Sequence, residues 1–334
     1  MNKIICLLIR TLSVLILLPC AGFYAGATTI DVLETFDYPG SSFTRPQKIN
    51  DLGVSAGLFI DGVTGASEGF RRSRSGQFSN PIVEPNDAAA FTEVRGINNR
   101  RIICGDYTGS DGLFHGFFLF HRNFLEFDIS SSFEIVLGLN NASDSSGSFI
   151  DDSDGVQKGF VDIGGVITSV VVPGASATLT YQINDSNQAT GYYIGGDGLT
   201  HGYLRDSSGT LTFPIDPPGS TGTILFGNNN SNWVVGRYSD EAGVTHGLFF
   251  TTPGDFVTFD FPGSTFTSLN GINADGFICG RYADATGLEH GFIARVTVTT
   301  GDKPSNTKSY TLPATVVRPA NPAPSKGVAA VPAS

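Results

Sequence analysis

The stretch "GINADGFICGRYADATGLEHGF", residues 271–292, decides the fold because an earlier part of the same chain spells nearly the same phrase. Residues 96–117 read "GINNRRIICGDYTGSDGLFHGF". Each copy holds an apolar run that ends in glycine and an aromatic residue, then a turn-rich stretch of Asp and Gly, then a second run that begins His-Gly-Phe. Two short apolar runs joined by such a loop predict a β-hairpin.

The phrase recurs along most of the chain. Its first anchor, a residue followed by Asn, occurs at Ile49-Asn50, Ile97-Asn98, Leu139-Asn140, Ile183-Asn184, Gly227-Asn228 and Ile272-Asn273. Successive asparagines lie 48, 42, 44, 44 and 45 residues apart. A third run such as "FVTFDFPG" at 256–263 and a fourth such as "FTSLN" at 266–270 complete a copy. Four short strands in about 44 residues is the size of a propeller blade.

The two ends of the repeated region complement each other. The final copy stops after "HGFIARV" with no strand of the "FDFPG" type behind it, whereas "VLETFDYPG" at 32–40 has no hairpin in front of it. A ring in which this N-terminal strand joins the last sheet would remove the exposed strand edges. The sequence therefore predicts an all-β, six-bladed β-propeller closed by the N-terminal strand, with an open β-solenoid as the alternative arrangement.

The segments outside the repeats have a different composition. Residues 1–27 carry Lys3 and Arg10, an apolar stretch at 12–18 and a small-residue cleavage pattern at 25–27, which together indicate a secretory signal peptide. The apolar stretch is shorter than the roughly 20 residues that span a bilayer. We expect a repeat domain at 28–296, a disordered tail rich in Thr, Pro and Ala at 297–334, and a secreted protein, extracellular or periplasmic.

Charge and cysteine content narrow the partners and the chemistry. The chain has 20 basic and 31 acidic residues, and loss of Lys3 and Arg10 with the signal peptide would leave 18 basic residues and lower the net charge from −11 to −13. Nucleic acids and anionic membrane surfaces are thus not expected as partners. Cys104 and Cys279 occupy equivalent places in non-adjacent repeats, so we expect small buried side chains and no disulfide between them.

The array of Gly-Ile-Asn, Gly-x-Tyr and His-Gly-Phe resembles the HAF-type repeat of bacterial proteins described as probable extracellular repeat proteins. The resemblance covers residues from about 35 to 296, with His-Gly-Phe, His-Gly-Tyr or His-Gly-Leu where the family has His-Ala-Phe. It implies secretion and a repeat β fold. It implies no reaction and no ligand.

The recurring polar residues have a structural and a chemical interpretation. Four histidines around one axis could bind a metal, but the first and third repeats have Glu68 and Lys158 at that position. We therefore predict struts, with each histidine ring hydrogen-bonded to a neighbouring strand or to the Asn or Tyr of its repeat, and we expect no metal and no cofactor. The predicted struts are Asn98, His115, Asn184, His201, His246, Asn273 and His290. The acidic stretch "DDSDG" at 151–155 resembles part of a calcium loop without its downstream Glu, and a hairpin turn is the alternative.

Departures from the repeat are the candidates for ligand binding, since a strut does not need them. In "RRSRSG" at 71–76, Arg71, Arg72 and Arg74 form a basic cluster that could bind an acidic sugar or a carboxylate-bearing surface. A solvated sheet edge is the alternative. Trp233, the single tryptophan, could stack on a sugar or belong to the core.

The sequence contains no Gly-x-Ser-x-Gly, no His-Glu-x-x-His and no phosphate-binding loop. We predict a non-catalytic binding or scaffold role outside the cell, with an extracellular polysaccharide or a surface protein as partner. One alternative is an extracellular carbohydrate-active hydrolase or lyase, because paired carboxylates from different blades would leave no local motif. The other alternative is a structural component of the surface or matrix.

Overall fold

The computed structural model describes residues 28–299, and all regular secondary structure in that range is β-strand. The all-β part of the prediction is therefore confirmed. Residues 28–299 include no helix that is long and apolar enough to cross a membrane. The predicted signal peptide at 1–27 and residues 300–334 of the predicted tail lie outside the described residues.

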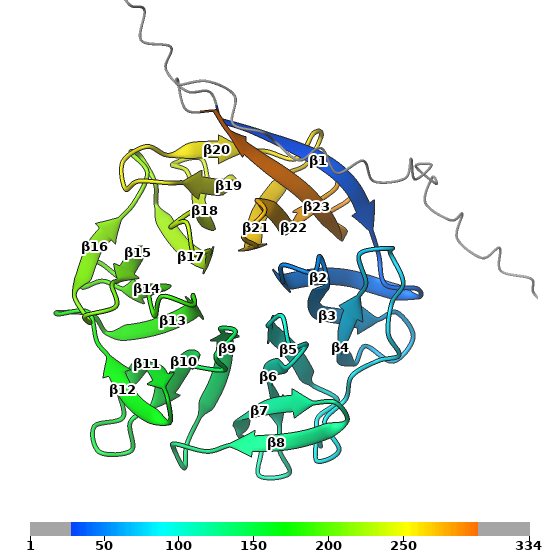
Figure 1. The fold of residues 1–334 in the computed structure, drawn as a ribbon, viewed down its shortest axis with the longest axis vertical. Helices are drawn as coiled ribbons and strands as arrows, with labels where there is room; N and C mark the ends of the chain where they lie inside the picture. Colours follow the sequence, from blue (N-terminus) through cyan, green and yellow to red (C-terminus); the bar gives the residue numbers. More distant parts are fainter. Residues whose placement is uncertain (1–27, 300–334) are drawn as a thin grey trace, which may run out of the picture.

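The strands form antiparallel groups arranged around a common centre (Figure 1). The first strand of a group lies nearest the centre and the later ones farther out. In chain order the groups are β2 (Ser41–Ile49), β3 (Ser55–Asp61) and β4 (Ser67–Arg72); β5 (Thr92–Ile97), β6 (Ile103–Thr108), β7 (Phe114–Phe120) and β8 (Asn123–Phe127); β9 (Glu134–Leu139), β10 (Ser145–Ile150), β11 (Gln157–Ile163) and β12 (Val166–Val170); β13 (Ala177–Ile183), β14 (Ala189–Ile194), β15 (Thr200–Arg205) and β16 (Leu211–Ile215); β17 (Gly222–Asn228), β18 (Val234–Ser239), β19 (Thr245–Phe250) and β20 (Val257–Phe259); and β21 (Phe266–Ile272), β22 (Phe277–Ala283) and β23 (Glu289–Val298).

The first strand of the chain pairs with the last one. β1 (Thr28–Phe36) runs antiparallel to β23 with Thr28 opposite Val298 and Phe36 opposite Gly291. The predicted tail boundary at residue 297 is therefore wrong by two residues, because Thr297 and Val298 still belong to β23 and pair with β1.

Each inner strand carries a β-bulge where it meets the second strand of its group. Between β5 and β6, Val94 pairs with Gly105 and Gly96 with Cys104, so that Arg95 has no partner in the ladder. A Cβ on Gly105 would collide with the carbonyl oxygen of Glu93, which explains the glycine in "IICG". A bulge turns the unpaired side chain in a new direction. In this chain the bulges direct side chains of the inner strands toward the central axis.

The second run of the phrase opens with glycine and an apolar residue, as in His-Gly-Phe, and this pair fills the core between neighbouring groups. Its apolar residue is fully buried in every repeat, with an exposed fraction of 0%, at Phe70, Phe117, Phe160, Tyr203, Leu248 and Phe292. Burial of one such side chain contributes about 1.5–3 kcal/mol, so the recurring Gly-Phe is a major source of stability. Cys104 and Cys279 are buried and unpaired, as predicted.

Candidate functional site

The asparagine after each inner strand links its repeat to the next. Its Nδ2 donates a hydrogen bond of 2.9–3.2 Å to the backbone carbonyl oxygen of the next such asparagine. The bonds run from Asn50 through Asn98, Asn140, Asn184, Asn229 and Asn273 back to Asn50. We call these residues the asparagine ring. Each amide also stabilises its own turn, as where Asn98 Oδ1 accepts from the backbone N–H groups of Arg100 and Ile102.

The fifth anchor assigned from the sequence is wrong by one residue. Asn229, not Asn228, is the member of the asparagine ring, and its Oδ1 accepts the N–H groups of Ser231 and Trp233. Asn228 takes the place that isoleucine has in Gly-Ile-Asn, and its Nδ2 donates to the carbonyl oxygen of Gln188. Successive asparagines in the run "GNNN" left the choice between them open to error.

The residues after the asparagine ring form a second belt. The backbone N–H of Asn141 donates to Asp185 Oδ1 at 2.8 Å, and that of Asp185 donates to Asn230 Oδ1 at 2.9 Å. Burial opposes ionisation of Asp185, but hydrogen bonds from Asn141 and Asn230 lower its pKa overall. The two belts line a cavity of about 420 Å³, the axial mouth, which also holds Asp51. Because the amides and carboxylates bond to one another, the axial mouth is mainly a structural closure.

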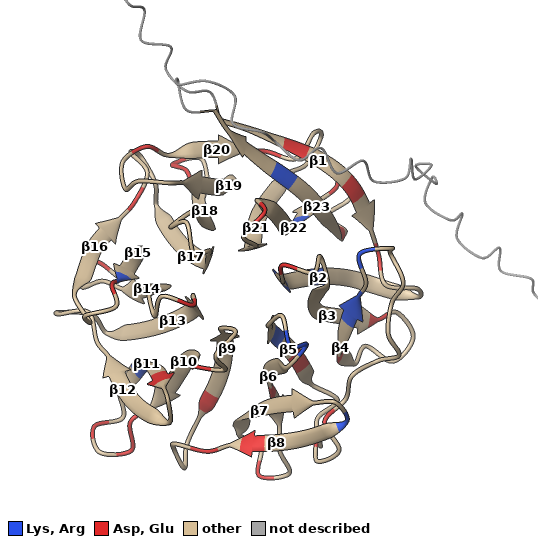
Figure 2. Cartoon of the chain, viewed as in Figure 1, with Lys and Arg blue, Asp and Glu red and all other residues tan. Residues whose placement is uncertain are grey.

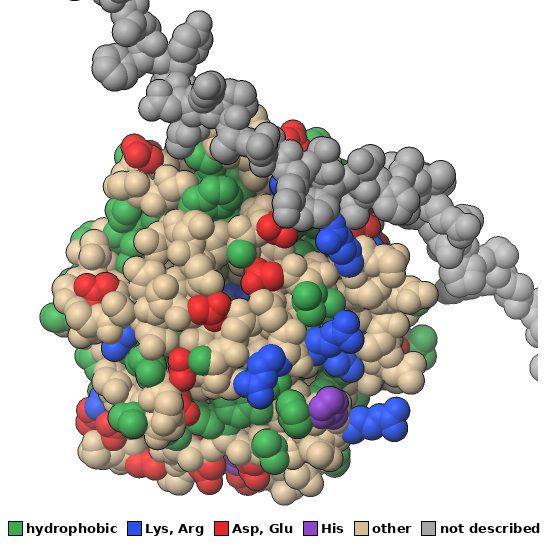
Figure 3. Space-filling view, viewed as in Figure 1, with side chains coloured by type: hydrophobic (Ala, Val, Ile, Leu, Met, Phe, Trp, Pro, Cys, Tyr) green, Lys and Arg blue, Asp and Glu red, His purple; other side chains and the backbone are tan. Residues whose placement is uncertain are grey.

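The charges around the axial mouth are visible in the figures. Figure 2 shows acidic residues in the loops at the inner ends of β2 and β13. Figure 3 shows acidic side chains near the centre of this face, whereas Lys and Arg side chains gather on the side that holds β2 to β5.

A second cavity on the axis, of about 390 Å³, has a different lining. We call it the arginine chamber; it is lined by Arg45, Gln47, Arg95, Tyr181, Phe226, Arg237, Asn270 and Arg281. It shares no lining residue with the axial mouth. Five of its residues are the unpaired bulge residues of inner strands, namely Gln47, Arg95, Tyr181, Phe226 and Asn270. Bulges in distant parts of the sequence thus bring their side chains to one place.

Part of the charge in the arginine chamber is balanced. Arg95 Nε lies 2.7 Å from Asp106 Oδ1, and the same guanidinium also pairs with Glu93. Arg281 pairs with Glu289. These ion pairs hold two of the four guanidinium groups in place.

Lys48 adds a further buried cation beside the chamber. Its side chain extends from β2 to β17, where Nζ donates to the backbone carbonyl oxygen of Phe226. Burial lowers the pKa of Lys48 to about 8. Gly271 of β21 permits this arrangement, since a Cβ there would collide with the backbone of Lys48.

The repeat histidines do not converge on the axis. Each ring lies between two carboxylates and stacks near the tyrosine of its own repeat, with ring centroids 5.1–5.4 Å apart. The pairs are His115 with Asp111 (3.1 Å) and Glu126 (3.6 Å), His201 with Asp197 (3.2 Å) and Asp216 (2.6 Å), His246 with Asp240 (3.3 Å) and Asp260 (2.7 Å), and His290 with Asp284 (3.4 Å) and Asp37 (3.0 Å). Within residues 28–299 no group of three or more His, Cys, Asp or Glu could hold a metal ion.

The acidic loop at 151–155 has partners of its own. Lys158 takes the histidine position of this repeat, and its Nζ lies 2.7 Å from a carboxylate oxygen of both Asp151 and Asp154. Asp152 accepts hydrogen bonds from Ser131 and Ser132. The loop therefore behaves as a turn closed by ion pairs.

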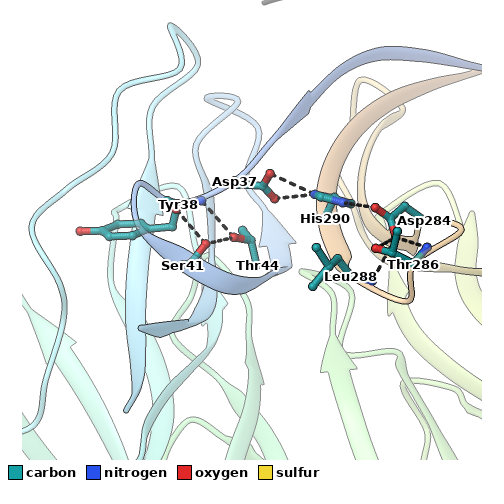
Figure 4. A network of polar contacts seen from close by, with 8 residues as sticks. All are labelled: Asp37, Tyr38, Ser41, Thr44, Asp284, Thr286, Leu288 and His290. Atoms are coloured by element: carbon teal, nitrogen blue, oxygen red, sulfur yellow. Dashed lines mark hydrogen bonds and ion pairs between the residues drawn. The ribbon is translucent and has the colours of Figure 1, made fainter. Parts of the chain in front are cut away.

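His290 also ties the beginning of the chain to its last repeat. Figure 4 shows Asp37, which follows β1, directed at His290 on β23, with Asp284 on the other side of the ring. Next to it, Thr44 Oγ1 accepts from the N–H of Tyr38 at 2.9 Å, which fixes the connection to β2.

The predicted basic cluster is divided by the structure. Arg72 is buried, and its guanidinium donates two hydrogen bonds to Glu34 of β1, at 2.9 and 2.7 Å, while lying 4.3 Å from the ring centroid of Phe36. The guanidinium group of Arg72 is therefore occupied by its hydrogen bonds to β1. Arg71 is half-buried, whereas Arg74 is exposed and lies 5.8 Å from the ring centroid of Phe277.

Trp233 lies at the edge of the core. It is half-buried and packs edge-on against Phe249, with 5.9 Å between ring centroids.

The residues of the arginine chamber were not singled out from the sequence, although a signal was present. The residue three before the ring asparagine differs in every repeat, and the residue between the glycine and the aromatic of the phrase also varies, although it is arginine in two repeats. Arg237 and Arg281 stand at that second position. A comparison of the repeats position by position would therefore have identified these residues as candidates for the axial site.

Comparison with known proteins informs the fold. No family model and no curated protein matches the chain. A putative TolB from Agrobacterium tumefaciens is 12% identical with a TM-score of 0.54, covering 82% of this chain and 99% of that one. This likeness shows a β-propeller fold, in agreement with the broader prediction.

Two further solved structures show weaker likeness. The Aleuria aurantia lectin in complex with Fucalpha1-6GlcNAc is 11% identical with a TM-score of 0.49, covering 80% of this chain and 100% of the lectin. The β-propeller domain of the Trilobed protease from Pyrococcus furiosus is 9% identical with a TM-score of 0.43, covering 78% of this chain and 100% of that domain.

Proposed function

We propose that this chain is a secreted, six-bladed β-propeller of the HAF-type repeat family that binds a ligand on its axis without chemically changing it. Its place would be outside the cell or in the periplasm, after removal of residues 1–27. The asparagine ring supports the blade number, because it has one member per repeat and returns to its first member. Pairing of β1 with β23 supports closure by the N-terminal strand.

One observation carries the binding role. The side chains that recur in every repeat hold the repeats together, whereas those that differ between repeats meet in the arginine chamber. A fold that needed only closure would not require arginine, tyrosine and phenylalanine at equivalent places. Ligand sites are concave and contain convergent polar groups that fix the orientation of the ligand. The chamber brings together guanidinium and amide groups with the aromatic rings of Tyr181 and Phe226. We propose an extracellular polysaccharide or a surface protein as the partner.

The test is retention of the mature chain on a panel of immobilised neutral and acidic polysaccharides, with analysis of the eluate for cleaved products. We expect retention without cleavage. Tyr181→Ala, in the chamber wall, should abolish retention, and Phe120→Ala, exposed on β7, should not. Circular dichroism shows whether Tyr181→Ala is folded, and Arg237→Gln serves as a second variant.

Three results would overturn the proposal. Cleaved products would favour the carbohydrate-active hydrolase or lyase. Retention that survives both Tyr181→Ala and Arg237→Gln would move the site away from the axis. Self-association of the chain without retention on any polymer would favour a structural matrix component.

A further inference from the structure

The charge inside the arginine chamber is not balanced by the protein. Four guanidinium groups line it and the ammonium of Lys48 lies beside it, while three carboxylates, Glu93, Asp106 and Glu289, pair with them. This excess of cations occurs in a chain with a net charge of −11. Buried charges are normally paired, because desolvation of an unpaired charge is unfavourable.

Of the four guanidinium groups that line the chamber, those of Arg45 and Arg237 are the unpaired ones in the described part of the chain. Among residues 28–299, neither guanidinium has a carboxylate within ion-pair distance. Arg45 lies over the ring of Phe43 at 5.0 Å, and its Nε is buried without a hydrogen-bond acceptor in that same part of the chain. Arg237 lies 5.5 Å from the ring centroid of Phe226 and 5.6 Å from that of Phe266. Aromatic faces hold the cations in position without neutralising them.

Ionisation of these groups reflects the same excess. Burial, together with the neighbouring charges of Arg281 and Arg95, lowers the pKa of Arg45 to about 10. Burial also lowers the pKa of Arg237. An anion bound between Arg45 and Arg237 would raise the pKa of both guanidinium groups.

The direction of approach follows from the two axial cavities. The axial mouth carries Asp51 and Asp185, which repel anions, and it shares no lining with the arginine chamber. Lys48 reaches from β2 to Phe226 beside the chamber. An anionic ligand would therefore enter from the face opposite the asparagine ring.

We propose that the arginine chamber binds the carboxylate of an acidic sugar or a similarly small organic acid, with Arg45 and Arg237 donating to it and Tyr181 and Phe226 packing against its carbon skeleton. The inference rests on the axial site of the proposed function and adds its ligand class. Guanidinium matches a carboxylate with two parallel donors, and its ion pairs with oxyanions are stronger than neutral hydrogen bonds.

The test compares glucuronate with glucose, which differ in the carboxylate, by calorimetric titration and by thermal unfolding of the mature chain at constant ionic strength. We expect glucuronate to bind and to raise Tm in a saturable way, and glucose to do neither. Arg45→Gln and Arg237→Gln should each weaken glucuronate binding at least tenfold. The same variants should raise Tm without ligand, because they remove an unbalanced buried charge. Arg122→Gln, exposed next to β8, is the matched control and should change neither quantity.

The outcomes separate the inference from the proposed function. Sulfate that competes with glucuronate supports an oxyanion site, and failure of sulfate to compete supports a carboxylate-specific one. Equal binding of glucose and glucuronate, or full glucuronate binding by both arginine variants, would refute the inference. If Tyr181→Ala still abolished retention on a neutral polysaccharide, the axial binding role would stand without its anionic ligand.

Discussion

At the scale of single residues, the residues that recur in the repeats and the residues that differ from the repeat pattern have separate roles. A ring asparagine satisfies backbone groups in two repeats at once, as Asn98 does with the carbonyl oxygen of Asn140 and two N–H groups of its own turn. Each repeat histidine lies between two carboxylates, as His201 does between Asp197 and Asp216. Departures such as Lys48 and Arg237 instead place charge near the axis, where the fold does not need it.

Replacement of Asn98 by alanine should lower the free energy of unfolding by about 2–3 kcal/mol, because buried backbone groups lose their partners. Asn98 is 2% exposed, so water cannot replace the lost bonds without rearrangement. Urea unfolding measures the change. Asn123→Ala, at an exposed site on β8, should alter stability by less than about 0.5 kcal/mol. An equal change in both variants would contradict the role of the asparagine ring.

The histidine pairs should make stability depend on pH. Burial opposes protonation of His246, but the hydrogen bonds that its ring donates to Asp260 and Asp240 outweigh this effect and raise its pKa above the usual value. A raised folded pKa gives stability that is fully present below about pH 6.5 and is lost as pH rises through the folded pKa. His246→Gln should therefore destabilise the protein most near pH 5.5 and progressively less toward pH 8.

Urea unfolding at several pH values measures this difference, and His121→Gln, at an exposed site, is its control. A destabilisation by His246→Gln that stayed constant between pH 5.5 and pH 8 would argue against a charged pair with Asp240 and Asp260.

At the scale of elements, β1 is the strand whose position depends most on distant residues. It pairs with β23, its Glu34 accepts two hydrogen bonds from Arg72 of β4, and Asp37 after it bonds to His290. The basic cluster interpreted as a ligand site thus contributes one arginine to holding this strand. An exposed edge of β23 would otherwise be open to pairing with other chains.

A mature chain that lacks residues 28–36 should have a lower Tm and should associate, because β23 loses its neighbour. Added peptide of residues 28–36 should restore Tm in a saturable way by pairing with that edge. A peptide with Glu34→Gln should restore less, since Arg72 loses its carboxylate partner. Thermal unfolding and light scattering measure both effects, and an unchanged Tm after truncation would rule out a structural role for β1.

At the scale of the whole molecule, the asparagine ring and β1 couple the first repeat to the last. The bond from Asn273 to Asn50 spans most of the described chain, in the same geometry as bonds between successive repeats. A linear array would lack this bond and could unfold from its ends. The coupled arrangement favours unfolding as a single unit.

Trp233 allows a direct measurement, because it is the single tryptophan and reports on one place beside β18. Its fluorescence and the far-ultraviolet circular dichroism of the entire domain should show the same urea midpoint. Asn273→Ala should shift both midpoints together. Separate midpoints for the two signals would show that repeats unfold independently.

The sequence by itself determined the all-β fold and the recurrence of its units, because both depend on a local pattern of apolar residues, glycines and turns that returns about every 44 residues. The position of the ring asparagine was off by one residue in the single repeat whose anchor contains consecutive asparagines. Local pattern cannot choose between adjacent identical side chains.

Only the tertiary structure decided which departures from the repeat meet. Arg45, Arg95, Arg237 and Arg281 lie on β2, β5, β18 and β22, far apart in the sequence. The arrangement of the strand groups around a common centre, with a bulge at Arg95, brings them to one chamber. Arg72, which looked like a surface residue, is buried because β1 packs over it with Glu34. The physical reason is the same in both cases: burial and charge compensation depend on neighbouring side chains that come from distant parts of the sequence.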